Sequence, residues 1–398
     1  MMRAAHRLGL TLACLLIGSN APASLRHPIH LKLDRVILVM RHGVRPPTKA
    51  PAMPANVTPE RWPEWAVPPG WLTAHGTAAV TALGRVDRAR LVQAGLVPAR
   101  GCPAAGAVSI IADSDQRTIA TADAWINGFA PGCAITSAHR PQGENDPMFS
   151  PLGNGVTLDA VAANAAVRTA IGAGGLAAID AQYKPLLHRL DAILCGARTT
   201  ACGVGRTPTT LAEATPTDRP KLRGALDLAS TAAQILLLEY ADGKPASEVG
   251  WGRASAADVT AMSAFHALEF RLLARPLPIA RANLALISRK IDEALTAPDA
   301  ARITLFSGHD TQIANLGGLL GVHWRIPGFA QDDPAPGGAL VIERLSDGSK
   351  HAFVRVKYRA QPLATIRAGG ATTVETVLAL PGCATLCPVD QFLRILRR

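Results

Sequence analysis

The chain has 398 residues, of which 48% are hydrophobic and 18% are charged, a composition typical of a globular protein with a large core. Its formal net charge of +11 admits nucleic acid, a membrane surface or an anionic small molecule as a partner. Aromatic residues make up only 4% and the basic residues are dispersed, which argues against nucleic acid. The charge instead suits the attraction of a small polyanion.

The first 23 residues have the pattern of a secretory signal peptide. Arg3 and Arg7 form a basic start, Leu8–Gly18 is apolar, and small residues precede a cleavage position after Ala23. A buried first helix is the alternative. We therefore expect a periplasmic or secreted protein, whose net charge falls from +11 to +9 when the two arginines are removed. No later apolar run reaches the roughly 18 residues that a membrane span needs.

Five apolar segments beyond the leader predict strands, at Arg35–Met40, Val108–Ala112, Ile303–Ser307, Ala339–Glu343 and Ala352–Tyr358. Helical patterns follow the first two, at residues 77–94 and 115–129. The stretch Ser346-Asp347-Gly348-Ser349 predicts a hairpin turn between the last two strands.

Residues 151–272 differ from the rest of the chain because they are rich in Ala and Leu and lack β-branched runs, apart from a polar excursion at 198–217. This pattern predicts an all-α cap domain inserted into an α/β protein. The expected fold is a discontinuous α/β domain, formed by residues 24–150 and 273–398, with a central mixed sheet flanked by helices. A cleft between the two domains is the expected place for a ligand.

Removal of the leader also removes Cys14 and leaves six cysteines: Cys102, Cys133, Cys195, Cys202, Cys383 and Cys387. An even count behind a signal peptide indicates disulfides in an oxidising compartment. Their order suggests the local pairs Cys102–Cys133, Cys195–Cys202 and Cys383–Cys387, although six cysteines allow about 15 connectivities. Zinc is the competing interpretation, but no histidine stands beside these cysteines.

Polar residues follow three of the predicted strands at the point where each strand ends. They are Arg41-His42-Gly43-Val44-Arg45, Asp113-Ser114-Asp115-Gln116-Arg117 and Gly308-His309-Asp310. If the three strands are parallel neighbours, the three ends converge on one point of the sheet edge. That point would hold three arginines, two histidines and an aspartate.

Three guanidinium groups around one point repel one another unless an anion lies between them. Phosphate fits best, because each guanidinium can donate to two of its oxygens. A neutral imidazole in one tautomer can attack phosphorus, and a second, protonated one can stabilise the charge of the transition state. A carboxyl group can protonate the leaving oxygen. Any one of these residues alone would more often be an ordinary surface or core residue.

The motifs RHGVRPP (Arg41–Pro47) and SGHDT (Ser307–Thr311) resemble the two signatures of the histidine acid phosphatases, the secreted branch of the histidine phosphatase superfamily. The resemblance is closest to bacterial periplasmic 6-phytases with acid phosphatase activity and to glucose-1-phosphatases. It extends over nearly the whole mature chain, through GWLTAHG (Gly70–Gly76), IADSDQRT (Ile111–Thr118), APGCAI (Ala130–Ile135), GWGR (Gly250–Arg253), HDTQIANLGG (His309–Gly318) and PAPGGALVIERL (Pro334–Leu345).

This resemblance implies a role for each matching residue. His42 would be the nucleophile and Asp310 the proton donor, while Arg41, Arg45, Arg117 and His309 would bind the phosphoryl group. The expected further substrate contacts are Thr48, Lys49, Asp113, His266 and Thr311; the alternative for His266 is a surface position on a cap helix. No metal or other cofactor is implied. The expected partner is a small phosphomonoester, either phytate or a sugar phosphate, bound by a monomer.

Two departures from the family pattern bear on the substrate. Gln312 stands where the phytases have Asn, and His75 replaces an arginine, which removes a positive charge that we expect near the pocket mouth. Thr311 favours a phytase, since the glucose-1-phosphatases more often have Ser there. A glucose-1-phosphatase or broad sugar phosphatase is therefore the first alternative. A phosphotransferase of the phosphoglycerate mutase type and an anion-binding protein without catalysis are the others.

Overall fold

The computed structural model describes residues 31–197, 202–348 and 351–398 of the chain. The expected signal peptide, residues 1–23, lies outside the described residues, as does Ser349 of the expected hairpin turn. No helix in these three ranges is both long enough and apolar enough to cross a membrane.

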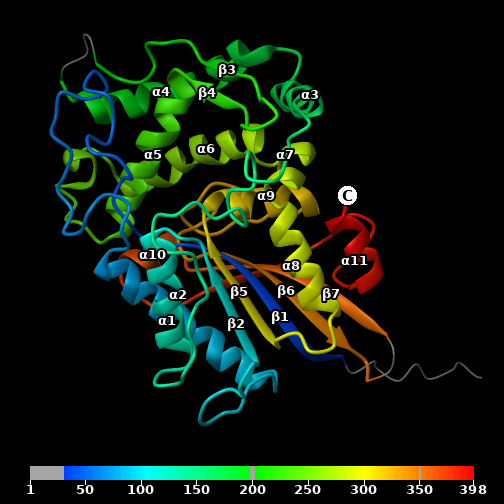
Figure 1. The fold of residues 1–398 in the computed structure, drawn as a ribbon. Coiled ribbons are helices and arrows are strands. Elements are labelled where there is room, and N and C mark those ends of the chain that lie inside the picture. Colours follow the sequence, from blue (N-terminus) through cyan, green and yellow to red (C-terminus); the bar gives the residue numbers. More distant parts are fainter. Residues whose placement is uncertain (1–30, 198–201, 349–350) are drawn as a thin grey trace, which may run out of the picture. The chain divides into compact units, whose positions relative to one another are not determined.

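A mixed sheet forms the centre of the described structure (Figure 1). It contains β1 (Lys32–Arg41), β2 (Val108–Ala112), β5 (Ile303–Gly308), β6 (Ala339–Ser346), β7 (Ala352–Ala360), β8 (Val374–Leu378) and β9 (Cys387–Pro388). The order is β2-β5-β1-β6-β7-β8, and β9 pairs with β7. All five predicted strands are confirmed, whereas β8 and β9 were not predicted.

The three strands that precede the polar motifs are parallel neighbours in this sheet. β1 and β2 both pair with β5, and the last residue pairs are Arg41 with Gly308 and Ala112 with Ser307. The carboxyl ends of β1, β2 and β5 therefore lie at one edge of the sheet. The predicted convergence of the three strand ends is confirmed.

Both faces of β1 are buried, which explains its continuous apolar run. Ile37 and Val39 belong to the core between the sheet and α8 (Ala285–Thr296), α9 (Asp310–Leu320) and α11 (Val389–Leu396). Val36, Leu38 and Met40 belong to the core beneath α1 (Ala74–Gln93) and α2 (Gln116–Phe129). A short helix, α10 (Leu363–Arg367), lies between β7 and β8 in the chain. This α/β fold with flanking helices is the class that the sequence predicts.

The middle of the chain is helical except for one small hairpin. Its helices are α3 (Ala160–Ile171), α4 (Gly175–Cys195), α5 (Ala225–Ala241), the 3₁₀ turn Val249–Gly252 and α6 (Ala256–Leu273), and α7 (Leu277–Asn283) follows. The hairpin joins β3 (Thr210–Ala212) to β4 (Lys221–Arg223), so the all-α prediction for residues 151–272 was wrong at this point. Thr209, Thr210 and the prolines on either side favour extended backbone there.

The helical region has a hydrophobic core of its own, which includes Leu190, Leu236 and Phe265. Helix α5 also contributes Leu237 and Leu238 to the core beside the sheet. Residues 31–398 form one compact unit by their contacts. The limits of a separate cap domain therefore stay a prediction.

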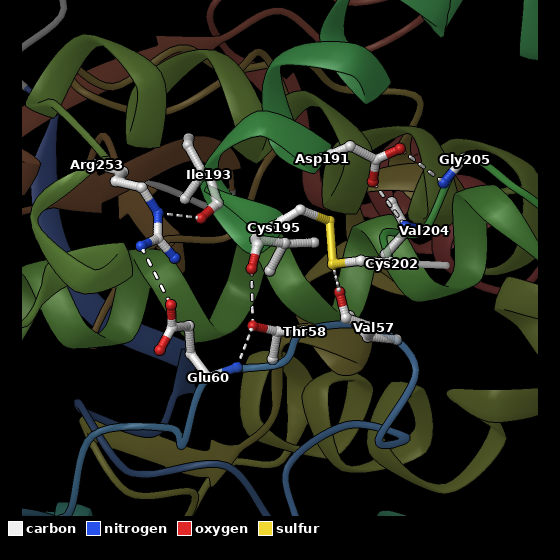
Figure 2. The surroundings of a disulfide bond; sticks show 11 residues. Val57, Thr58, Glu60, Asp191, Ile193, Cys195, Cys202, Val204, Gly205 and Arg253 are labelled. Carbon is white, nitrogen blue, oxygen red and sulfur yellow. Dashed lines mark hydrogen bonds and ion pairs between the residues drawn. A yellow bond between two sulfur atoms is a disulfide. The ribbon is translucent and has the colours of Figure 1, made fainter. Parts of the chain in front are cut away.

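The six cysteines beyond the leader form three disulfides, Cys102–Cys133, Cys195–Cys202 and Cys383–Cys387. These are the local pairs that the order along the chain suggests. The second of them lies at the carboxyl end of α4, where Sγ of Cys202 is 3.3 Å from the Val57 carbonyl oxygen (Figure 2).

Candidate active site

The carboxyl ends of β1, β2 and β5 bring the predicted histidines together. His42 follows β1 and His309 follows β5, and their ring centroids are 5.6 Å apart. His309 is the N-cap of α9, and Asp310 is the first residue of that helix. Arg117 reaches the same place from the first turn of α2, which follows β2.

The His42 ring is buried and held in one tautomer. Its Nδ1 atom is 2.8 Å from the Gly43 carbonyl oxygen, which can only accept a hydrogen bond, so Nδ1 carries the proton. Nε2 therefore keeps its lone pair. Burial lowers the pKa of His42 well below its ordinary value, and the charges of Arg45, Arg117 and Arg41 lower it further. The result is a neutral imidazole, as a nucleophile requires.

Three arginines surround His42 with donors that the protein does not satisfy. Arg41 is fully buried and donates to the Pro334 carbonyl and, over 3.0 Å, to Gln234 Oε1. Arg45 donates to the Pro46 carbonyl. Among the residues that the structure describes, Nε of Arg41, of Arg45 and of Arg117 is buried without a hydrogen-bond partner. Burial and Arg117 lower the pKa of Arg45 to about 9, which still leaves it cationic at neutral and acid pH.

His309 is oriented by carboxylates that follow β2. Its Nε2 atom is 2.7 Å from Asp113 Oδ2 and 3.4 Å from Asp115 Oδ2, and its Nδ1 atom is 3.4 Å from Arg117 Nη2. One potential metal-ligating atom from each of Asp113, Asp115 and His309 lies within 4.8 Å of the other two, so the three residues could hold a metal ion. Arg117 already pairs with Asp115 over 2.6 Å, so a cation would have to compete with it.

Asp310 is the centre of a second group of charges. Its Oδ2 atom is 3.0 Å from Arg41 Nη2 and 3.7 Å from His266 Nε2, and its Oδ1 atom accepts from the Thr311 amide over 2.9 Å. Burial raises the pKa of Asp310, but the charges around it, above all Arg41 and then His266 and Arg45, outweigh this effect and hold the pKa far below the usual range. Asp310 is therefore ionised in the protein without a bound ligand.

His266 reaches this group from α6 and is itself held by a buried carboxylate. Its Nδ1 atom is 2.6 Å from Asp333 Oδ1. Asp333 and Gln234 are site residues that were not predicted from the sequence. A sequence signal for Asp333 does exist, because the Pro334–Leu345 motif begins at the next residue. Gln234 is one position on a helix, and nothing local in the sequence distinguishes it.

A cavity of about 610 Å³ opens beside these residues. Five of the predicted residues line it: Arg45, Thr48, Lys49, His266 and Asp310. The wall formed by α5 and α6 adds Asp227, Leu228, Ser230, Thr231, Gln234, Ile235, Leu238 and Glu269. The predicted contacts Asp113 and Thr311 are not among the lining residues; they lie behind His309 and beside Asp310.

The two departures from the family pattern are also placed away from this cavity. Gln312 is buried; it accepts a hydrogen bond from the His309 amide and donates one to the Phe149 carbonyl, over 2.9 Å in each case. The His75 ring is 2.7 Å from the Ile366 carbonyl oxygen of α10. Neither residue lines the cavity, so the expected effect of His75 at the pocket mouth has no support in the geometry.

Val57 and Thr58, which follow Thr48 and Lys49 in the same loop, are fixed to the carboxyl end of α4, as Figure 2 shows. Thr58 Oγ1 donates to the Leu194 carbonyl over 2.7 Å, and the Gly203 amide donates to the Val57 carbonyl over 3.2 Å. Sγ of Cys202 lies 3.3 Å from the same Val57 oxygen. The Cys195–Cys202 disulfide thus joins the two segments that hold this loop.

Comparisons with known proteins agree with the geometry. Residues 32–170 and 273–359 match the model of the histidine phosphatase superfamily (branch 2). The chain is 37% identical over 383 residues to the phytase AppA of Escherichia coli K12, covering 89% of this chain and 87% of the relative. It is 29% identical to a glucose-1-phosphatase of Salmonella typhimurium, covering 97% of both. The Hafnia alvei phytase in complex with myo-inositol hexakis sulphate is 32% identical, with a TM-score of 0.82 over 93% of this chain and 97% of that one.

Proposed function

The chain belongs to the histidine phosphatase superfamily (branch 2), and we propose from this premise that it is an acid phosphomonoesterase that acts through a phosphohistidine and releases phosphate from phytate and other phosphomonoesters. One observation carries the proposal. Within the described part of the chain, three guanidinium groups each keep a buried, unpaired Nε–H near a neutral imidazole whose proton is on Nδ1, which leaves the Nε2 lone pair available. An anion with several oxygens satisfies these donors, and phosphorus is the electrophile that such a lone pair attacks.

In the first step the phosphate group of the ester lies among Arg41, Arg45, Arg117 and His309. Nε2 of His42 forms a bond to phosphorus while the ester P–O bond breaks, and the leaving oxygen keeps the electron pair. Asp310 gives this oxygen a proton. The arginines neutralise the oxygens of the phosphoryl group during transfer. In the second step water attacks phosphorus, the P–Nε2 bond breaks, and Asp310 takes the proton from water.

Asp310 must carry a proton for the first step, yet Arg41 and its cationic neighbours keep it ionised in the protein by itself. The incoming phosphate group adds negative charge beside these cations. This charge opposes their effect and raises the pKa of Asp310 in the complex. An acid medium then supplies the proton, which is the physical reason to expect an acid optimum.

Thr48 and Lys49 line the cavity beyond the arginines, and this supports phytate as a substrate, because further phosphate groups would meet them there. The similarity to the glucose-1-phosphatase favours a sugar phosphatase as the alternative. The three disulfides support a periplasmic or secreted location for the mature chain after cleavage at Ala23. We propose that the chain acts as a monomer and that residues 151–272 form a cap domain.

The deciding experiment is phosphate release by the mature chain with EDTA present, comparing phytate with glucose 1-phosphate at about pH 4–5. Faster release from phytate supports the phytase assignment, and preference for glucose 1-phosphate supports the alternative. No release from either substrate, or activity lost to the chelator, would contradict the histidine mechanism.

A further inference from the structure

The wall of the cavity opposite the Thr48–Lys49 loop carries two carboxyl groups that the reaction does not use. Asp227 lies on α5 and Glu269 on α6, and these helices pack against each other. Both side chains are partly buried. Ser230 donates a hydrogen bond to Glu269 Oε2 over 2.5 Å, which fixes this carboxyl group on the wall.

The charges that face these carboxyls come from several elements. Lys49 and Arg45 approach from the loop after β1, Arg223 from β4, His266 from α6 and Asp310 from α9. Burial raises the pKa of Asp227, and Glu269 raises it further, while Arg223 and Lys49 oppose them. The two carboxyls thus act on each other as like charges across the helix pair.

This arrangement makes the cavity unusual for a ligand with many phosphates. Among the described residues that line it, Arg45 and Lys49 are the permanent cations, whereas Asp227, Glu269 and Asp310 are carboxyls. The unpaired arginine donors serve one phosphate group. The remaining anionic groups of a polyphosphate would share Lys49 and would lie near two carboxylates.

We propose that Asp227 and Glu269 form a charge filter on the cavity wall: their negative charges repel polyphosphorylated substrates, and protonation of Asp227 weakens this repulsion. The inference rests on the proposed function, because it concerns which phosphomonoesters reach the same arginines. Preference for a polyanion over a monophosphate is then greatest in acid. The direction of this pH dependence follows from the raised pKa of Asp227. This residue keeps its proton to a higher pH than an ordinary aspartate does, and it repels the ligand above that range.

The test uses myo-inositol hexakis sulphate, which cannot be turned over by phosphoryl transfer. Sulfate monoesters stay singly charged through the acid and neutral range, so any pH dependence of binding comes from the protein. We would measure its dissociation constant calorimetrically at about pH 4 and about pH 6.5, for the wild type and for the Asp227→Asn/Glu269→Gln double variant. The matched control is Asp390→Asn/Glu293→Gln, which removes the same groups from exposed positions on α11 and α8.

We expect the affinity of the wild type to be at least about 30-fold lower at the higher pH than at the lower one. For the double variant, this ratio of affinities should be at least about tenfold smaller. All other charged groups of the site are the same in both proteins, so their effects cancel in the comparison. The control should behave as the wild type does, and affinity for inorganic sulfate should change less than affinity for the hexakis sulphate. The same pH dependence in wild type and double variant would overturn the inference. Because calorimetry needs no turnover, failure of the proposed function would appear separately, as the absence of p-nitrophenyl phosphate hydrolysis by the wild type.

Discussion

The arginine floor beside the cavity (Arg41, Arg45 and Arg117, of which Arg45 lines the cavity) and the helical wall of the cavity (Asp227 and Glu269) are encoded in different ways. The floor follows the ends of parallel strands, so its position is fixed by hydrogen bonds between β1, β5 and β2. The wall consists of single positions on α5 and α6, and no contiguous sequence motif marks them. The difference suggests that the floor determines the chemistry and the wall determines which esters reach it.

The largest expected effect is that of His42→Ala on the floor. Loss of the nucleophile should lower kcat by at least about 10,000-fold on every phosphomonoester, because no other lone pair is placed to attack. Binding of inorganic sulfate, measured by calorimetry, should persist because the arginines remain. His188→Ala, an exposed position on α4, is the control. Activity within about tenfold of the wild type would mean that His42 is not the nucleophile.

The second effect separates the proton donor from the rest of the floor. Asp310→Asn should lower kcat on glucose 1-phosphate by about 100- to 1,000-fold, because an alkoxide leaves poorly without a proton. On p-nitrophenyl phosphate the loss should be below about tenfold, since this phenolate leaves readily. Parallel assays with the two substrates decide the matter. Equal losses would remove the assignment of Asp310 as the acid.

His266 joins the two regions, because it lies on α6 and is 3.7 Å from Asp310. It is one of the groups that lower the pKa of Asp310, so His266→Asn should raise that pKa. The acid then keeps its proton to higher pH, and the alkaline limb of the kcat profile should move upward by about one pH unit. His188→Asn is the matched control. A limb that stays in place, or moves to lower pH, would show that His266 does not act through Asp310.

The floor was predictable from sequence because each of its motifs is contiguous and begins where an apolar run ends. Parallel pairing then made one site of three distant segments. Gln234 was not predictable, since it meets Arg41 only through the packing of a helix against the sheet edge. Asp333 stands beside the Pro334–Leu345 motif, but its contact with His266 depends on the same packing. The hairpin of β3 and β4 and the strand β9 were missed because each of these strands has three residues or fewer. The strand β8, with the sequence VETVL, has five residues, as β2 has, but lacks the apolar run Ile110–Ala112 that marks β2. Periodicity has little to measure over such lengths.

The smallest expected effect concerns the loop that faces the helical wall. Replacing Cys195 and Cys202 by Ser should lower the free energy of unfolding by about 2–3 kcal/mol, the amount expected for so short a loop. It should also loosen the Val57 and Thr58 contacts, so that the KM for phytate rises about three- to tenfold while kcat on p-nitrophenyl phosphate changes less. The comparison is the Cys102–Cys133 pair, replaced in the same way, whose cysteines follow α1 and α2 in the chain. Removal of that pair should lower stability without the rise in KM, because no contact of the cavity loop depends on it. If both double variants raised the KM equally, the effect would be a general loss of stability, and the Cys195–Cys202 disulfide would have no particular role in holding the loop.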